Sequence, residues 1–317
     1  MSDSDTKVVY AALGGNLLVA VSKFVAAAMT GSAAMLSEGV HSLVDTGNEG
    51  LLLYGMHRAK LPADARYPFG RGKEIYFWSF VVALLVFALG AGVSIVAGII
   101  HLREPAELEN PLVNYIVLGL SILFEGYSWR VAIRAFKATK GKRSYFDAIR
   151  RGKDPTTFAV LLEDSAALLG LLVALASLVL GQVTGNPYFD GAASLVIGLI
   201  LAATAVWLGR ETKGLLIGES ANSEVVLGIR ELIGGNHQVD RVNEILTVHM
   251  GPDFILVNIS LHVAADVERA EVHAVYERID DSIKQHFPKV KRVFIESERN
   301  SQAPVAGPVP YPAPEPN

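Results

Sequence analysis

A long apolar segment decides the fold class: residues 75–100 read IYFWSFVVALLVFALGAGVSIVAGII and include no charged side chain. A helix needs about 20 mostly apolar residues to cross the hydrocarbon core of a bilayer. On either side of this segment the sequence has further apolar runs of similar length. We therefore predict six membrane-spanning helices, at residues 8–29, 33–57, 74–101, 112–136, 155–181 and 188–208.

The composition agrees with a membrane protein. Of the 317 residues, 51% are hydrophobic, and the mean hydropathy of +0.35 is high for a soluble enzyme. A net charge of −4 gives no support to nucleic-acid binding. The chain has no cysteine, which excludes disulfides and cysteine-bound zinc. Any metal site must therefore be built from His, Asp and Glu.

Lys and Arg residues gather in two of the loops between these spans, which predicts the orientation. The uncharged turn near Gly31 and the loop at 182–187 carry none, and the loop at 102–111 has one Arg against three Glu. Because basic residues concentrate on the cytoplasmic side, we predict that both termini are cytoplasmic. The basic residues of the two loops are Arg58, Lys60, Arg66, Arg71 and Lys73, then Lys137, Lys140, Lys142, Arg143, Arg150, Arg151 and Lys153.

Turn and cap signals mark the ends of several spans. Asp154-Pro155 predicts a helix N-cap followed by proline in the first turn. Gly31-Ser32, Pro105, Pro111 and Asn186-Pro187 mark other boundaries.

The segment after the last span is charge-rich and predicts a separate α/β domain. A helix at 223–234 precedes alternating strands at 241–250 and 253–264, and a helix at 267–286 precedes a strand at 290–298. This α-β-β-α-β order predicts two helices on one face of a three-stranded sheet. We thus expect three parts: a transmembrane domain at 1–208, an α/β domain at 209–300, and a disordered, proline-rich tail at 301–317.

Ionisable residues inside predicted spans are expensive to bury and are candidates for function. His41 and Asp45 lie four residues apart on one helix face of the second span, and Asp164 lies in the fifth span. At a rise of about 1.5 Å per residue, Asp45 lies roughly 18 Å and Asp164 roughly 17 Å below the outer face of a core about 30 Å thick. The shared depth predicts a metal or proton site, because Zn²⁺ accepts imidazole and carboxylate ligands.

Three other ionisable residues lie in predicted spans. For Glu163, which points about 100° away from Asp164, we expect a hydrogen bond between helices. Lys23 and Glu125 need partners, either each other or groups along a metal pathway; the sequence does not choose between these.

With these features the sequence resembles the cation diffusion facilitator family. The resemblance covers most of residues 8–300 and includes the turn at Gly31-Ser32-Ala33, the run from His41 to Asp45, Asp164, and Asp190 opening the sixth span. A further match is the segment Phe69-Gly70-Arg71-Gly72-Lys73-Glu74. The resemblance implies a homodimer with a cytoplasmic ferredoxin-like domain that exchanges divalent metal for protons. It also implies that His41, Asp45 and Asp164 match three of the family's four intramembrane ligands.

The sequence departs from the family at the fourth ligand, where Val160 stands. Valine cannot bind a metal, so water or another residue must complete the site. Glu49 is our favoured substitute because it lies one turn beyond Asp45. A role for Glu49 as a gate or proton carrier at the cytoplasmic entrance remains an alternative.

Two further metal positions of the family look altered. In the loop between the second and third spans, Asp64 and Tyr67 lie near Arg71, whose charge argues against a metal. In the α/β domain the matching positions hold Asn243, Asn258, Glu271, Glu296 and Glu298, and the histidines His249, His262, His273 and His286 are scattered. We expect the α/β domain to dimerise and any metal sensing there to be weak or based on carboxylates.

We therefore predict an integral membrane protein that exports Zn²⁺, or Fe²⁺, Co²⁺, Cd²⁺ or Mn²⁺, as a transported substrate, with no tightly bound cofactor. The expected partners are the metal, protons, the lipid bilayer and a second copy of the chain, in a bacterial cytoplasmic membrane. One imidazole among carboxylates favours zinc over manganese. The alternatives are a metal sensor or scaffold without transport, which Val160 keeps open, and a membrane metallohydrolase, for which the sequence shows no nucleophile motif.

Overall fold

The computed structural model describes residues 3–105, 111–141 and 143–297. The chain divides into two compact units. The membrane unit comprises Met1–Arg58 and Glu74–Lys213, and the sheet unit comprises Ala59–Lys73 and Gly214–Asn317. The loop at 59–73 joins two helices of the membrane unit but groups with the sheet unit. The predicted tail at 301–317 lies outside the described residues.

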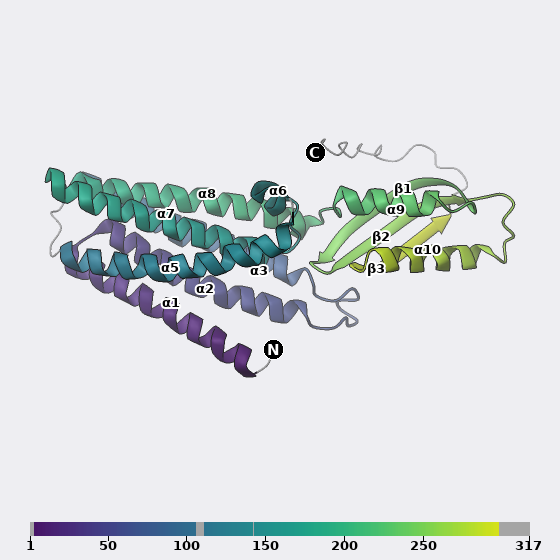
Figure 1. Ribbon diagram of the computed structural model, residues 1–317, viewed down its shortest axis with the longest axis horizontal. Coiled ribbons are helices and arrows are strands. Elements are labelled where there is room, and N and C mark those ends of the chain that lie inside the picture. Colours follow the sequence, from purple (N-terminus) through teal and green to yellow (C-terminus); the bar gives the residue numbers. More distant parts are fainter. Residues whose placement is uncertain (1–2, 106–110, 142, 298–317) are drawn as a thin grey trace. The chain divides into compact units, whose positions relative to one another are not determined.

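The membrane unit consists of long helices that run alongside one another (Figure 1). One of them is continuous from Glu74 to Arg103 and contains a short π-helical segment, η1, which the sequence did not predict. The helices are α1 (Asp3–Thr30), α2 (Ala33–Ala59), α3 (Glu74–Leu85), η1 (Val86–Ala91), α4 (Gly92–Arg103), α5 (Pro111–Lys140), α6 (Tyr145–Arg150), α7 (Pro155–Thr184) and α8 (Tyr188–Ile217).

Four helices of the described residues are long and apolar enough to cross a membrane. A shorter apolar helix covers Asn16–Thr30, within α1. The helix α2 is absent from this set because ionisable residues, among them Glu38, His41 and Asp45, lower its hydropathy. The four spans are Glu74–Arg103, Pro111–Lys137, Phe158–Thr184 and Tyr188–Ile217, so the total of six remains a prediction.

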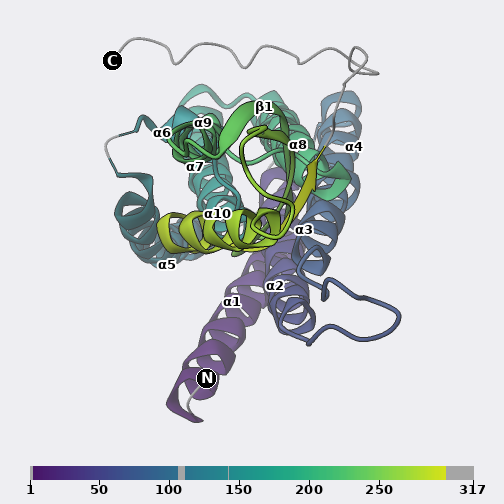
Figure 2. The ribbon, with the colours of Figure 1, turned by 90° about the vertical axis from the view of Figure 1, so that its right-hand side faces the viewer.

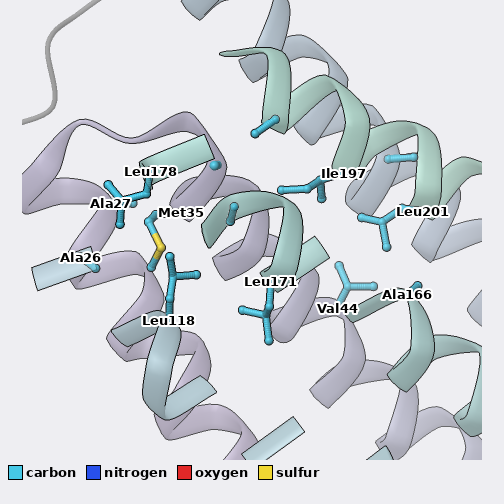
Figure 3. Close-up of a cluster of buried hydrophobic side chains, with 14 of the residues drawn as sticks. Ala26, Ala27, Met35, Val44, Leu118, Ala166, Leu171, Leu178, Ile197 and Leu201 are labelled. Atoms are coloured by element: carbon cyan, nitrogen blue, oxygen red, sulfur yellow. The ribbon is translucent and has the colours of Figure 1, made fainter. Parts of the chain in front are cut away.

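Small and medium apolar side chains from α1, α2, η1, α5, α7 and α8 fill the interior of the membrane unit (Figure 3). Small residues allow helix backbones to approach closely in membranes. The labelled side chains come from α1 (Ala26, Ala27), α2 (Met35, Val44), α5 (Leu118), α7 (Ala166, Leu171, Leu178) and α8 (Ile197, Leu201).

The predicted start of α7 is confirmed in detail. The Asp154 side chain accepts a hydrogen bond from the Thr156 backbone N–H at 3.1 Å, and Pro155 occupies the first turn. The helix ends at Gly185, whose φ of 68° is left-handed and favours glycine. These signals fix the length of the helix that carries Asp164.

The sheet unit has the predicted α-β-β-α-β order. Its strands lie in the order β1-β2-β3, with β1 and β2 antiparallel and β2 and β3 parallel. Both helices lie on the same side of the strands (Figure 2). The elements are α9 (Ser223–Gly234), β1 (Val239–Gly251), β2 (Phe254–Val263), α10 (Val272–His286) and β3 (Val290–Ser297).

Alternation along β2 explains this arrangement. The side chains of Ile255, Val257, Ile259 and Leu261 are buried, and successive side chains of a strand point to opposite faces. They pack against apolar residues of α9 and α10, including Ile229. The predicted placement of two helices on one face is therefore confirmed.

The loop at 59–73 approaches the β1–β2 hairpin very closely. A Cβ atom added to Gly72 would lie only 3.1 Å from the Cα of Gly251 and would overlap the carbonyl oxygen of Met250. Glycine at position 72 is thus required for this contact.

Candidate metal site

The N-terminus of α2 is capped by a side chain from another helix. The carboxylate of Asp190, on α8, accepts hydrogen bonds from the hydroxyl of Ser32 and the backbone N–H of Ala33, both at 2.5 Å, and from the N–H of Ala34 at 3.4 Å. The first N–H groups of a helix have no partner within the helix. Asp190 supplies acceptors for them and thereby fixes the end of the helix that carries His41.

His41 and Asp45 lie together on α2, as predicted. His41 is almost completely buried, and its Nδ1 lies 3.3 Å from Oδ1 of Asp45. Within the described part of the chain, however, neither ring nitrogen of His41 nor Oδ1 of Asp45 has a hydrogen-bond partner. Buried polar atoms are usually hydrogen-bonded. These three atoms are thus available for a ligand.

Asp164 lies on α7 and faces α5. Its Oδ2 accepts a hydrogen bond from the hydroxyl of Ser128 at 3.0 Å. One residue further along α7, Ser165 accepts a hydrogen bond from the indole N–H of Trp129 at 3.1 Å. These two contacts hold α5 and α7 together at the level of Asp164.

The structure does not bring the three predicted ligands together into one metal-binding group. Among the described residues, no three His, Cys, Asp or Glu side chains lie close enough to hold a metal ion. The expected direct contact of His41, Asp45 and Asp164 is therefore not formed in this conformation. The reason is that depth in a membrane fixes only one coordinate, whereas Asp164 turns toward Ser128 of α5.

Electrostatic interactions nevertheless link the predicted ligands on α2 and α7. Five carboxyl groups from α2, α5 and α7 interact electrostatically, and we call them the carboxyl cluster. Carboxyl groups gathered in a low-dielectric interior offer oxygen ligands to a divalent cation, whose charge favours their ionised forms. The carboxyl cluster consists of Asp45, Glu49, Glu125, Glu163 and Asp164.

Glu49 belongs to the carboxyl cluster but is held by α1. Its Oε1 accepts a hydrogen bond from the side-chain amide of Asn16 at 2.7 Å. Val160, at the family's usual fourth ligand position, packs against a cluster of buried apolar residues that includes Leu52 and Phe158. Neither contact decides between Glu49 as a ligand and Glu49 as a gate.

The expected helix–helix hydrogen bond of Glu163 is confirmed. The side-chain amide of Asn48, on α2, donates to Oε1 of Glu163 at 3.1 Å, and both residues are buried. This bond joins α2 and α7 between Asp45 and Glu49.

Lys23 has partners that sequence reasoning did not identify. Its Nζ lies 3.1 Å from Oε2 of Glu38 and 2.7 Å from Oγ of Ser42, both on α2. The pair with Glu125, one of the two predicted alternatives, is also present at 3.9 Å. An available signal was the presence of Glu38 within an apolar span, since a buried carboxylate needs a cation as much as Lys23 needs an anion.

The loop at 59–73 forms a compact turn around Asp64. Arg71 donates to its Oδ2 at 2.8 Å and lies over the ring of Tyr67, 4.3 Å from the centroid. This hydrogen bond, together with that from the backbone N–H of Tyr67, holds the pKa of the Asp64 carboxyl below its usual value. The carboxylate of Asp64 is thus paired with Arg71, which agrees with the argument against a metal at this loop.

Four of the five histidines of the sheet unit, those singled out above, have separate surroundings. His249 is buried beside the carbonyl of Gly251, and His262 lies 3.6 Å from Asp240. The other two, His273 and His286, lie on α10 and have neighbours on that helix. They are scattered as predicted, while Glu298 lies outside the described residues.

Comparisons with known proteins agree with this arrangement. Residues 9–217 match the cation efflux transmembrane domain, and residues 221–300 match the cytoplasmic domain of cation efflux proteins. Metal tolerance protein C4 of Arabidopsis thaliana is 35% identical over 248 residues, which are 78% of this chain and 54% of that protein.

Two further relatives carry the names of particular metals. The mitochondrial proton-coupled zinc antiporter of Homo sapiens is 33% identical over 77% of this chain and 44% of that protein. The manganese efflux system protein MneP of Bacillus subtilis is 23% identical over 91% of this chain and 94% of that protein. The chain spans about half the length of the plant and mitochondrial relatives. By the match over residues 9–217, the chain belongs to the cation diffusion facilitator family, whose members are transporters rather than enzymes.

Proposed function

We propose that this protein exports zinc, or a similar divalent cation, from the cytoplasm in exchange for protons. The metal passes through a site formed by His41, Asp45 and Asp164, with Glu49 as the fourth ligand. Membership of the family supports export of a metal, and the similarity to a zinc antiporter supports both zinc and proton exchange.

The observation that carries this proposal is the set of buried ligand atoms on α2. Both ring nitrogens of His41 and Oδ1 of Asp45 are buried, and the described residues offer them no hydrogen-bond partner. Leaving such groups unpaired costs free energy in a membrane interior. A metal ion that accepts both imidazole nitrogen and carboxylate oxygen removes that cost.

Metal binding at all three ligands requires a change in the membrane unit. The side chain of Asp164 must leave the hydroxyl of Ser128 and turn toward α2, where Asp45 already interacts with it electrostatically. A dication that enters between the two carboxylates relieves their repulsion. We propose that this closure is the step that loads the metal.

The same family membership supports our proposals on architecture. We propose six spans with both termini in the cytoplasm, a cytoplasmic ferredoxin-like domain at 209–300, and a homodimer formed through that domain. The match of residues 221–300 to a cytoplasmic domain supports this placement. We further propose a bacterial cytoplasmic membrane as the location.

Zinc is the preferred substrate on chemical grounds. Imidazole suits zinc, whereas manganese favours oxygen ligands. The carboxyl cluster, however, is rich in oxygen, and the similarity to MneP keeps manganese open as a substrate.

A metal sensor without transport is the second candidate, and Val160 favours it. This valine packs among apolar side chains at the position where the family usually has a ligand. A site with one ligand fewer binds metal, but its capacity to carry metal across the membrane needs a direct test.

Metal counterflow with the purified full chain in proteoliposomes provides that test. Vesicles loaded with unlabelled zinc should accumulate labelled zinc, and Asp164→Asn should abolish the exchange because an amide lacks the charge needed for the dication. Zinc binding without counterflow would instead support the sensor.

A further inference from the structure

A buried lysine lies beside the candidate metal site and joins three helices. Lys23, on α1, is fully buried, and Nζ has three oxygen neighbours: Oε2 of Glu38, Oγ of Ser42 and, more distantly, Oε1 of Glu125. An ammonium group has three N–H donors. The three neighbours come from α2 and α5, so one side chain connects α1 to both helices.

Two of the partners of Lys23 lie on either side of His41 in the sequence of α2. Glu38 lies three residues before His41, and Ser42 lies one residue after it. The next residue of α1, Phe24, packs so closely against α2 that a Cβ atom added to Gly39 would lie 3.1 Å from its ring. The contact of α1 with α2 therefore covers the helical turn that carries His41.

Glu38 also meets α7. A Cβ atom added to Gly170 would overlap Oε1 of Glu38, so this carboxylate lies directly against the backbone of α7. The Lys23–Glu38 pair thus lies where α1, α2 and α7 come together. Rotation or sliding of α2 past either neighbour would break the contacts of a buried charge, which is costly.

His41 lacks the usual means of orientation. A metal-binding histidine normally has its ring fixed by a hydrogen bond from the second nitrogen to a neighbouring acceptor. In the described structure, neither nitrogen of His41 makes such a bond, although Nδ1 lies 3.3 Å from Oδ1 of Asp45 on the same helix. The direction of its ring must therefore follow from the placement of α2.

We propose that Lys23 is a positioning residue for His41. By holding Glu38 and Ser42, it fixes the rotation of α2 against α1 and α7 and so directs the imidazole toward the metal. The proposal rests on the proposed metal site. Because His41 is the only nitrogen ligand of that site, a loss of positioning should weaken zinc more than manganese.

The test measures equilibrium affinities of Zn²⁺ and Mn²⁺ for the purified full chain. In Lys23→Met/Glu38→Gln, both buried charges are removed together, so that neither remains unpaired. We expect zinc to bind about tenfold more weakly, with a smaller change for manganese, so the ratio of zinc to manganese affinity falls. Ser42→Ala should shift the ratio in the same direction, whereas Ser42→Thr, which keeps the hydroxyl, should resemble the parent.

A matched control removes a buried contact of α1 elsewhere. The hydroxyl of Thr30 contacts Asn114 of α5 at 3.0 Å, and Thr30→Val should lower thermal stability without changing the affinity ratio. If the double variant does not fold, the Ser42 pair decides the question: equal ratios in Ser42→Ala and Ser42→Thr overturn the proposal.

The outcomes separate this proposal from the proposed function. If Lys23→Met/Glu38→Gln keeps the zinc affinity of the parent while Asp164→Asn loses it, the metal site stands and the role of Lys23 is wrong. Equal weakening of both metals would also contradict positioning of His41. If the parent binds neither metal, the proposed function fails and this inference with it.

Discussion

At the scale of single residues, Val160 leaves the candidate site one ligand short. Its side chain packs among apolar residues, and the nearest ionisable substitute along α2, Glu49, is held by Asn16. A metal that draws Glu49 into the site must replace this hydrogen bond. The role of Glu49 is therefore open to direct measurement.

We predict that Glu49→Gln weakens zinc binding by about tenfold, because the site then loses one of its charged oxygen ligands. The variant Val160→His/Glu49→Gln should restore zinc affinity and reduce manganese affinity, since a second imidazole replaces a carboxylate. Isothermal titration of both metals checks this. Unchanged zinc affinity in Glu49→Gln would show that water, not Glu49, completes the site.

The sequence predicted which residues are important more reliably than their partners. Glu163 was correctly expected to join two helices. The pair of Lys23 with Glu125 was one of two alternatives, but the nearer partners of Lys23 and the partner of Asp164 were not predicted, because the rotation of each helix about its axis depends on packing with all the others. That packing is a property of the folded molecule and leaves little trace in a single segment.

At the scale of helices, the capping of α2 by Asp190 is a contact between elements distant in sequence. The carboxylate accepts from two backbone N–H groups and from Ser32, and His101 of α4 lies 3.5 Å from it. The negative charge is also favourable at a helix N-terminus.

We predict that Asp190→Ala lowers the free energy of unfolding by about 1–2 kcal/mol, as the loss of a helix cap does. Asp190→Asn should be milder because the amide oxygen still accepts a hydrogen bond. Thermal unfolding of the full chain in detergent measures the order of stability among the parent and the two variants. Equal stability of Asp190→Ala and the parent would mean that water replaces this cap without cost.

Local signals predicted several helix starts well, but the predicted end of the sixth span at 208 was wrong because α8 continues to Ile217. Asp154-Pro155 correctly marked the start of α7, and the alternation along β2 correctly gave its buried face. The π-helical segment within Val86–Ala91 was missed, because one extra residue in a turn leaves the apolar character of the segment unchanged.

At the scale of the whole molecule, the chemistry of the proposed ligands leads us to expect coupling to protons. Metal binding needs a neutral imidazole and ionised carboxylates, so loading releases protons and acid competes with metal.

We therefore predict that zinc uptake into proteoliposomes speeds up when the vesicle interior is made acidic relative to the outside, because protons leaving the vesicle exchange for entering metal. Collapse of the gradient with a protonophore should return uptake to the rate of passive exchange. Indifference of uptake to the imposed gradient would rule out proton antiport.

Zinc flux through proteoliposomes of Asp45→Ala and Asp164→Ala, beside the parent, tests the central claim most directly. Both variants should insert and assemble as the parent does, since neither side chain is needed for the apolar packing of the membrane unit, yet each should lose zinc flux almost completely. Near-normal flux in both variants would contradict the assignment of the metal site.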